Sequence, residues 1–187
     1  MISSLTRTAA AAAIFGLILT GCSSDHSMDG DDMAAISEMS GPMADIAFAQ
    51  MMIPHHEQAI VMSDYALRNT TNPQILELAG EISAAQDPEI AQMTAMLERF
   101  GADMGGHEGH VMAGMLTDDE LAALDAARGP QFDVLFLEAM IAHHVGAIDM
   151  AEDVLASGSD PEVRALAEEI ISAQQAEIDA MTMLLAK

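Results

Sequence analysis

The chain has 187 residues, which is enough for one domain with a core of its own. Its formal net charge of −24 at pH 7 argues against nucleic acid as a partner, because phosphates would be repelled. The composition includes 17 methionines, no tryptophan and only 3% aromatic residues. Methionine packs irregular cores, and its thioether also binds soft ions such as Cu(I), so composition leaves both roles open.

The chain begins with a segment typical of a secretory signal peptide. Arg7 is its only charge, and the apolar run over residues 9–19 is too short to span a bilayer permanently. The run ends in Leu-Thr-Gly-Cys, which resembles a bacterial lipobox in which Cys22 is acylated. We therefore predict a lipoprotein signal peptide at residues 1–21 and a flexible Met-, Asp- and Ser-rich tether at residues 22–40.

This reading predicts an exported protein held at the membrane by its N-terminal lipid. The anchor would lie on the outer face of the cytoplasmic membrane, or in the periplasm at the outer membrane. The alternative is a plain signal peptide followed by an incidental cysteine. Because Cys22 is the only cysteine, lipidation would leave no thiol for disulfides or thiolate metal sites.

The remaining chain is duplicated. Residues 48–97 align without gaps to residues 136–185 at an offset of 88, with 21 identities over 50 positions. Both copies contain Met-Ile-x-His-His, and both contain Gln-x-x-Glu-Ile-x-x-Met further along. A duplicated unit predicts a pseudo-symmetric fold in which each half contributes equivalent groups.

Each copy is predicted to form a helical hairpin, because apolar residues recur at spacings of three and four. Asn72-Pro73 and Asp160-Pro161 supply an N-cap followed by proline at the first helical position. Thr117 and Glu120 resemble a capping box, which predicts a short helix between the two copies. The predicted long helices cover residues 42–68, 73–100, 130–156 and 161 onward.

Two hairpins of long helices with short turns predict an all-α four-helix bundle. The link between the hairpins is long enough to cross the bundle. Pro54 and Pro88 fall inside predicted helices, where each removes a backbone hydrogen bond and should kink its helix. The predicted domain covers residues 41–187, with repeat one at 42–100, a Met/His-rich link at 101–129 and repeat two at 130–187.

The duplicated histidine pairs are the strongest chemical signal. His55 and His56 recur as His143 and His144. Adjacent helical residues point about 100° apart, so we expect one of each pair in the bundle interior and the other at a helix seam. A purely structural role would have to account for both pairs, whereas imidazole is a common transition-metal ligand. We therefore predict all four as metal ligands.

Methionines and glutamates recur around these pairs at helical spacing. The spacing also suits a hydrophobic core, so packing and ligation both remain open for the methionines. Glu89 and Glu177 are either direct ligands or acceptors that fix an imidazole tautomer, and the softer thioether-rich setting favours the second role slightly. The methionines are Met52, Met62 and Met93 in the first copy and Met140, Met150 and Met181 in the second.

The link contains a second candidate site. Its stretch from residue 104 to residue 115 holds three methionines, two histidines and four glycines. Glycine lets a loop wrap an ion, while histidine and methionine supply nitrogen and sulfur ligands. The predicted ligands in this stretch are Met104, His107, His110, Met112 and Met115.

Together, the paired Met-Ile-x-His-His-x-x-Ala-Ile-x-Met and Gln-x-x-Glu-Ile-x-x-Met segments resemble family 305 of the domains of unknown function. The resemblance covers about residues 40–187 and both motif copies. It implies a ferritin-like four-helix bundle and, as in some bacterial members, periplasmic copper binding linked to copper resistance. It also implies that the four paired histidines, with the matching methionines, lie at or near the metal sites.

The leading hypothesis is a non-enzymatic lipoprotein that binds Cu(I), with Ag(I) or Cu(II) as further ions, for sequestration, buffering or resistance. A ferritin-like di-metal oxidase is a second hypothesis, but it needs several inward carboxylates and Glu-x-x-His pairs, which neither histidine helix has. Haem binding lacks a Cys-x-x-Cys-His motif. A structural envelope lipoprotein without tight metal is the remaining alternative. Homo-oligomerisation and a metal-transfer partner stay open.

Overall fold

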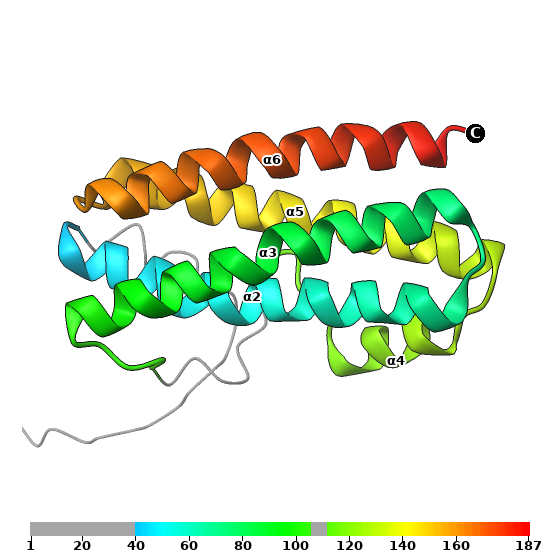
Figure 1. Ribbon diagram of the computed structural model, residues 1–187, viewed down its shortest axis with the longest axis horizontal. Helices are drawn as coiled ribbons and strands as arrows, with labels where there is room; N and C mark the ends of the chain where they lie inside the picture. The colour runs from blue at the N-terminus through cyan, green and yellow to red at the C-terminus, as the bar shows by residue number, and fades with distance from the viewer. Residues whose placement is uncertain (1–39, 106–111) are drawn as a thin grey trace, which may run out of the picture.

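The computed structural model describes residues 40–105 and 112–187, and this part of the chain is an elongated helical bundle (Figure 1). The long helices begin and end within one residue of the predicted positions, and the predicted short helix is present. The all-α fold of two duplicated hairpins is therefore confirmed. The helices are α2 (Pro42–Asn69), α3 (Pro73–Phe100), α4 (Asp118–Ala126), α5 (Pro130–Ser157) and α6 (Pro161–Leu185).

Local sequence signals account for the helix ends. The Asn72 side chain accepts a hydrogen bond from the backbone N–H of Gln74, and the Asp160 side chain accepts from Glu162 and Val163. Thr117 opens α4 through the predicted capping box. Pro54 and Pro88 lie inside α2 and α3 as predicted, and each helix continues through its proline as one element.

The two hairpins meet through their first helices. α2 packs against α3 and α5 packs against α6, while α2 and α5 lie antiparallel along each other. The backbone N–H of Gly41 donates to the Ser157 carbonyl at 2.8 Å, and that of Gly129 donates to the Asn69 carbonyl at 2.8 Å. These bonds join the start of each helix to the end of the other. α4 lies against α2 (Figure 1).

Within the described residues, α5 is long and apolar enough to cross a membrane by length and composition. The same helix packs against both α2 and α6, and half of its most apolar stretch is buried in the bundle. These contacts are those of a core helix in a bundle.

The hydrophobic core consists of two separate clusters, one toward each end of the bundle. Each cluster takes side chains from both hairpins, because α2 and α5 run in opposite directions. The first cluster includes Phe48, Met52, Met93, Met150 and Ile170. The second cluster includes Met62, Ile82, Phe136, Met140 and Met181.

A fully buried carboxylate joins the hairpins at one end of the bundle. Asp45, in the first turn of α2, accepts hydrogen bonds from the Ser159 backbone N–H and hydroxyl at 3.1 Å and from the Asp160 N–H at 2.9 Å. Its counterpart in the second copy, Asp133, accepts a single bond from the Asn72 side chain at 2.9 Å. The two equivalent aspartates therefore accept different numbers of hydrogen bonds.

We predict that Asp45→Ala lowers the free energy of unfolding by about 2–4 kcal/mol, because several donors lose a charged acceptor in a buried setting. Asp133→Ala is the matched control and should cost clearly less, since one hydrogen bond is lost. Urea denaturation of the metal-free protein measures both. Equal losses of unfolding free energy in the two variants would contradict a larger stabilising role for Asp45 than for Asp133.

Candidate metal centre

A layer of polar side chains separates the two hydrophobic clusters at the middle of the bundle. On each long helix, a histidine pair or the glutamine and glutamate of the repeated motif lie between the segment that belongs to the first cluster and the segment that belongs to the second. The motif repeats bring the same residue types from both halves. This polar layer consists of His55 and His56 on α2, Gln86 and Glu89 on α3, His143 and His144 on α5, and Gln174 and Glu177 on α6.

His55 and His143 face each other where α2 and α5 pair. Their ring centroids are 3.8 Å apart with an interplanar angle of 39°, and both side chains are fully buried. Burial, together with the neighbouring His56, lowers the pKa of His55 to about 3. Burial, with His55 beside it, also lowers the pKa of His143 well below its usual value. Both imidazoles are therefore neutral at pH 7 and able to act as ligands.

His56 and His144 turn toward the second helix of their own hairpins. The Nε2 atom of His56 lies 2.7 Å from a Glu89 carboxylate oxygen, and that of His144 lies 2.6 Å from Glu177. A carboxylate accepts, so Nε2 of each ring carries the proton and donates it. In the neutral imidazole, Nδ1 then presents a lone pair. As expected, one histidine of each pair lies between α2 and α5 and the other lies at the seam with the second helix of its own hairpin. All four histidines are fully buried.

Many polar atoms of the layer have no partner within the protein. Of the eight imidazole nitrogens, five are buried without one: Nδ1 of His55, His56 and His144, and both nitrogens of His143. Buried polar atoms in proteins are nearly always paired, so an unpaired group of this size marks a place for an ion or water. Each imidazole in its neutral form offers one nitrogen lone pair, and such lone pairs suit a metal ion.

Gln86 and Gln174 belong to the layer but were not among the predicted ligands. Their side chains are 2% and 3% exposed, and neither the amide nitrogen nor the amide oxygen of either has a hydrogen-bond partner. Each lies one turn before the glutamate that binds a histidine. The signal that could have identified them was their repetition in both copies of the Gln-x-x-Glu motif.

The six methionines predicted either as ligands or as core residues lie on both sides of the polar layer, and all are fully buried. Each cluster mixes methionines from the two halves of the sequence, so the two methionines that flank one histidine pair along the chain lie in different clusters. Thioethers are therefore available on either side of the imidazoles. Met52, Met93 and Met150 belong to the first cluster, and Met62, Met140 and Met181 belong to the second.

The structure places the predicted ligands of the link in different surroundings. Met112 is buried in the first cluster and Met115 packs against it, whereas Met104 is 44% exposed. His107 and His110 lie outside the described residues, as does Cys22. The structure therefore brings two of the five predicted link ligands to the core, where packing is an adequate reason for their burial.

The end of the link forms a strap across the paired helices, defined here as residues 112–116. The His55 Nε2 atom donates to the Ala113 carbonyl at 3.2 Å. Gln58 holds Leu116 through two hydrogen bonds, of 2.9 Å and 2.7 Å. At the equivalent position of α5, a Cβ on Gly146 would lie 1.9 Å from the Ala113 carbonyl oxygen, so only glycine leaves room for the strap there.

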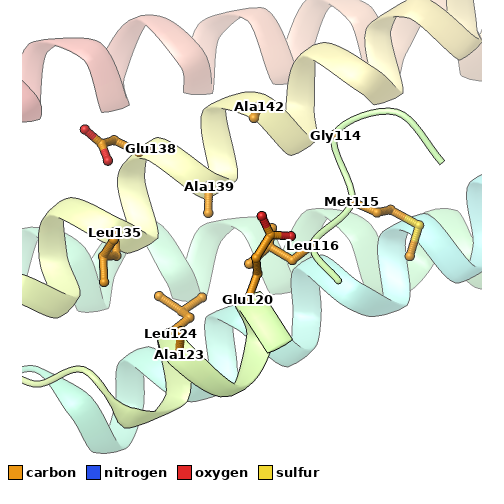
Figure 2. A pocket seen from close by; sticks show the side chains of 10 residues that line it. All are labelled: Gly114, Met115, Leu116, Glu120, Ala123, Leu124, Leu135, Glu138, Ala139 and Ala142. Atoms are coloured by element: carbon orange, nitrogen blue, oxygen red, sulfur yellow. The ribbon is translucent and has the colours of Figure 1, made fainter. Parts of the chain in front are cut away.

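A groove of about 360 Å³ lies between the strap, α4 and α5 (Figure 2). Its walls are mostly apolar, with Glu120 and Glu138 on opposite sides. Ala142, which precedes His143, lies in its wall, but none of the four histidines lines it. The groove is therefore separate from the polar layer.

The donor set of the layer fits a soft ion better than a hard one. Within residues 40–105 and 112–187, no three histidine, cysteine, aspartate or glutamate side chains converge on one point. A site here would therefore combine imidazole pairs with thioether or amide groups. Cu(I) and Ag(I) accept such sulfur and nitrogen ligands at low coordination number.

We predict that the metal-free protein loses stability as the pH falls from about 6.5 toward 3. In that range His55 and His143 take up protons in the unfolded chain but not in the fold, because burial lowers their folded pKa. Each contributes about 1.4 kcal/mol per pH unit. Urea denaturation at several pH values in the presence of chelator should show a shallower pH slope for His55→Leu/His143→Leu. Identical pH slopes for the parent and the variant would contradict the inference that His55 and His143 are neutral in the folded protein.

Solved structures of known proteins share this architecture. A DUF305 protein of Streptomyces coelicolor, named as a candidate secreted protein, is 30% identical, with a TM-score of 0.71 over 76% of this chain and 92% of that one. A DUF305 fragment from Deinococcus radiodurans is 33% identical, with a TM-score of 0.71 over 79% and 98%. CopM in the Cu(II)-bound form is 33% identical, with a TM-score of 0.67 over 79% and 97%.

CopM has also been solved in Cu(I)-bound, Ag-bound and apo forms, each 33% identical to this chain. Among curated proteins, the uncharacterized protein L153 of Acanthamoeba polyphaga mimivirus is 43% identical over 47 residues, which is 25% of this chain and 31% of that protein. The match thus spans about a third of that relative. The family described as Domain of unknown function (DUF305) matches residues 22–97 and residues 45–185. The chain therefore belongs to the DUF305 family.

Proposed function

We propose that this protein binds copper, chiefly as Cu(I), in the polar layer and has no catalytic role. The observation that supports this most strongly is the set of four buried histidines with five unpaired ring nitrogens between two methionine-containing clusters. Support also comes from the likeness to CopM, which has been solved with Cu(I), Cu(II) and Ag bound. Binding without catalysis would serve to sequester or buffer the ion.

In this proposal the ligands are Nδ1 of the imidazoles and thioether sulfurs from the flanking clusters. Glu89 and Glu177 act on the histidines rather than on the metal. Each carboxylate holds the Nε2–H of its histidine, which fixes the tautomer and makes Nδ1 a better donor. The Ala113 carbonyl does the same for His55.

A di-metal oxidase is a weaker reading of the same layer. Such centres need several inward carboxylates in addition to histidines. The two glutamates in the layer are each engaged with a histidine, and among the described residues no three carboxylate, imidazole or thiol side chains form a group that could hold a metal ion. The donor set thus favours capture of a soft ion.

We further propose that the protein acts outside the cytoplasm, anchored through lipid on Cys22. The N-terminal sequence pattern supports export and lipidation. The likeness to a Streptomyces coelicolor protein named as a candidate secreted protein supports export as well. An exported copper-binding protein would meet the ion before it enters the cell.

The proposal predicts tight Cu(I) and Ag(I) binding that depends on the polar layer. The test uses the chain without residues 1–21 and with Cys22→Ser, titrated with Cu(I), Ag(I) and Zn(II) against a competing chelator. Changing all four layer histidines to alanine should abolish tight Cu(I) and Ag(I) binding, because the nitrogen ligands are gone. Circular dichroism would establish that the variant stays helical.

The matched control is His107→Ala/His110→Ala, which removes the histidines of the link and should leave tight binding in place. If this control loses tight binding while the layer variant keeps it, the site lies in the link and the proposal is wrong. If the parent chain binds no more tightly than a disordered Met/His peptide, the copper function itself fails.

Glu89→Gln and Glu177→Gln should each weaken Cu(I) binding by about 10- to 100-fold without changing the number of ions bound, since the carboxylate orients a ligand and is not one itself. Affinity follows from the chelator competition, and the number of ions follows from native mass spectrometry. Loss of a bound ion from either variant would instead make that glutamate a direct ligand.

A further inference from the structure

We infer that Gln86 and Gln174 give the polar layer a second binding mode, in which their amide oxygens help to hold Cu(II). The inference rests on the proposed copper function and deepens it. The two glutamines would determine how well the site binds Cu(II) relative to Cu(I), a role separate from that of the histidines and methionines.

The first support is that burying these amides without hydrogen bonds costs folding free energy. Gln86 is 2% exposed and Gln174 is 3% exposed, and all four of their amide nitrogen and oxygen atoms lack a partner in the protein. A leucine would fill the same space without leaving unpaired polar atoms. The duplicated motif nevertheless contains glutamine at both positions.

The second support is the contrast with Gln58 and with the two glutamates of the layer. Gln58 is also largely buried, but its amide makes two hydrogen bonds to Leu116. Glu89 and Glu177 are engaged with histidines. Each glutamate accepts from its histidine through one carboxylate oxygen and is partly exposed, whereas the two amide oxygens of the layer are buried and unpaired.

The third support is the chemistry of the ion. Thioethers select Cu(I), whereas Cu(II) favours tetragonal sets of nitrogen and oxygen ligands. The layer offers lone pairs on Nδ1 of His56 and His144. Each of these histidines donates a hydrogen bond to a glutamate, and the glutamine with the unpaired amide lies one helical turn before that glutamate. Imidazole nitrogen with amide oxygen suits Cu(II), and imidazole nitrogen with thioether sulfur suits Cu(I).

The test compares two ions in one variant. In the chain without residues 1–21 and with Cys22→Ser, Gln86→Leu/Gln174→Leu should weaken Cu(II) binding by at least about tenfold while Ag(I), a redox-inert probe for Cu(I), binds within about threefold of the parent. Affinities are measured by chelator competition. The electron paramagnetic resonance spectrum of bound Cu(II) should also change, because an oxygen ligand is replaced.

Two further variants separate ligation from structure. Gln175→Leu changes an exposed glutamine next to Gln174 and should alter neither affinity. Gln86→Glu keeps an oxygen donor and should retain Cu(II) binding within about tenfold or strengthen it. In the metal-free state the double leucine variant should unfold at a higher temperature than the parent, because unpaired buried amides are removed.

The outcomes are distinct. Loss of Cu(II) affinity with Ag(I) affinity kept supports the inference. Equal loss for both ions, no loss for either, or a parent chain that binds Ag(I) but not Cu(II) overturns it while leaving the proposed function in place. A parent chain that binds neither ion overturns both.

Discussion

The structure depends on the antiparallel pairing of two copies of one helix. His55 lies midway between Gly41 and Asn69, and the backbone bonds from Gly41 and to Asn69 fix α2 against α5 at both ends. When a helix pairs antiparallel with its own copy, the residue at the midpoint meets its equivalent. His55 therefore faces His143 at 3.8 Å, and the polar layer is built around this contact.

The same pairing decides what surrounds the layer. Residues before the midpoint of α2 share a cluster with residues after the midpoint of α5, so Met52 joins Met150 and Met62 joins Met140. Amides and thioethers carry no charge, burial keeps His55 and His143 neutral at pH 7, and the two glutamates of the layer remain partly exposed to solvent. The layer can therefore persist in a metal-free core and still offer lone pairs to an ion.

The two halves differ where the link crosses them. Gln58 and Gly146 occupy the same position in the two copies, and the strap uses the first for hydrogen bonds and the second for close approach. His55 gains the Ala113 carbonyl as a partner, whereas both ring nitrogens of His143 stay unpaired. A duplicated sequence thus produces unequal histidines, because a single link can cover only one of two related surfaces.

The sequence alone determined the helices, their caps and the hairpin duplication, because spacing, proline and N-cap signals act within a few residues. It also identified the four histidines, through their repetition. Only the tertiary structure decided that His56 and His144 bind Glu89 and Glu177, that methionines pair across the halves, and that Gln86 and Gln174 are buried without partners. These features depend on which helix faces which, and local sequence does not encode that rotation and register.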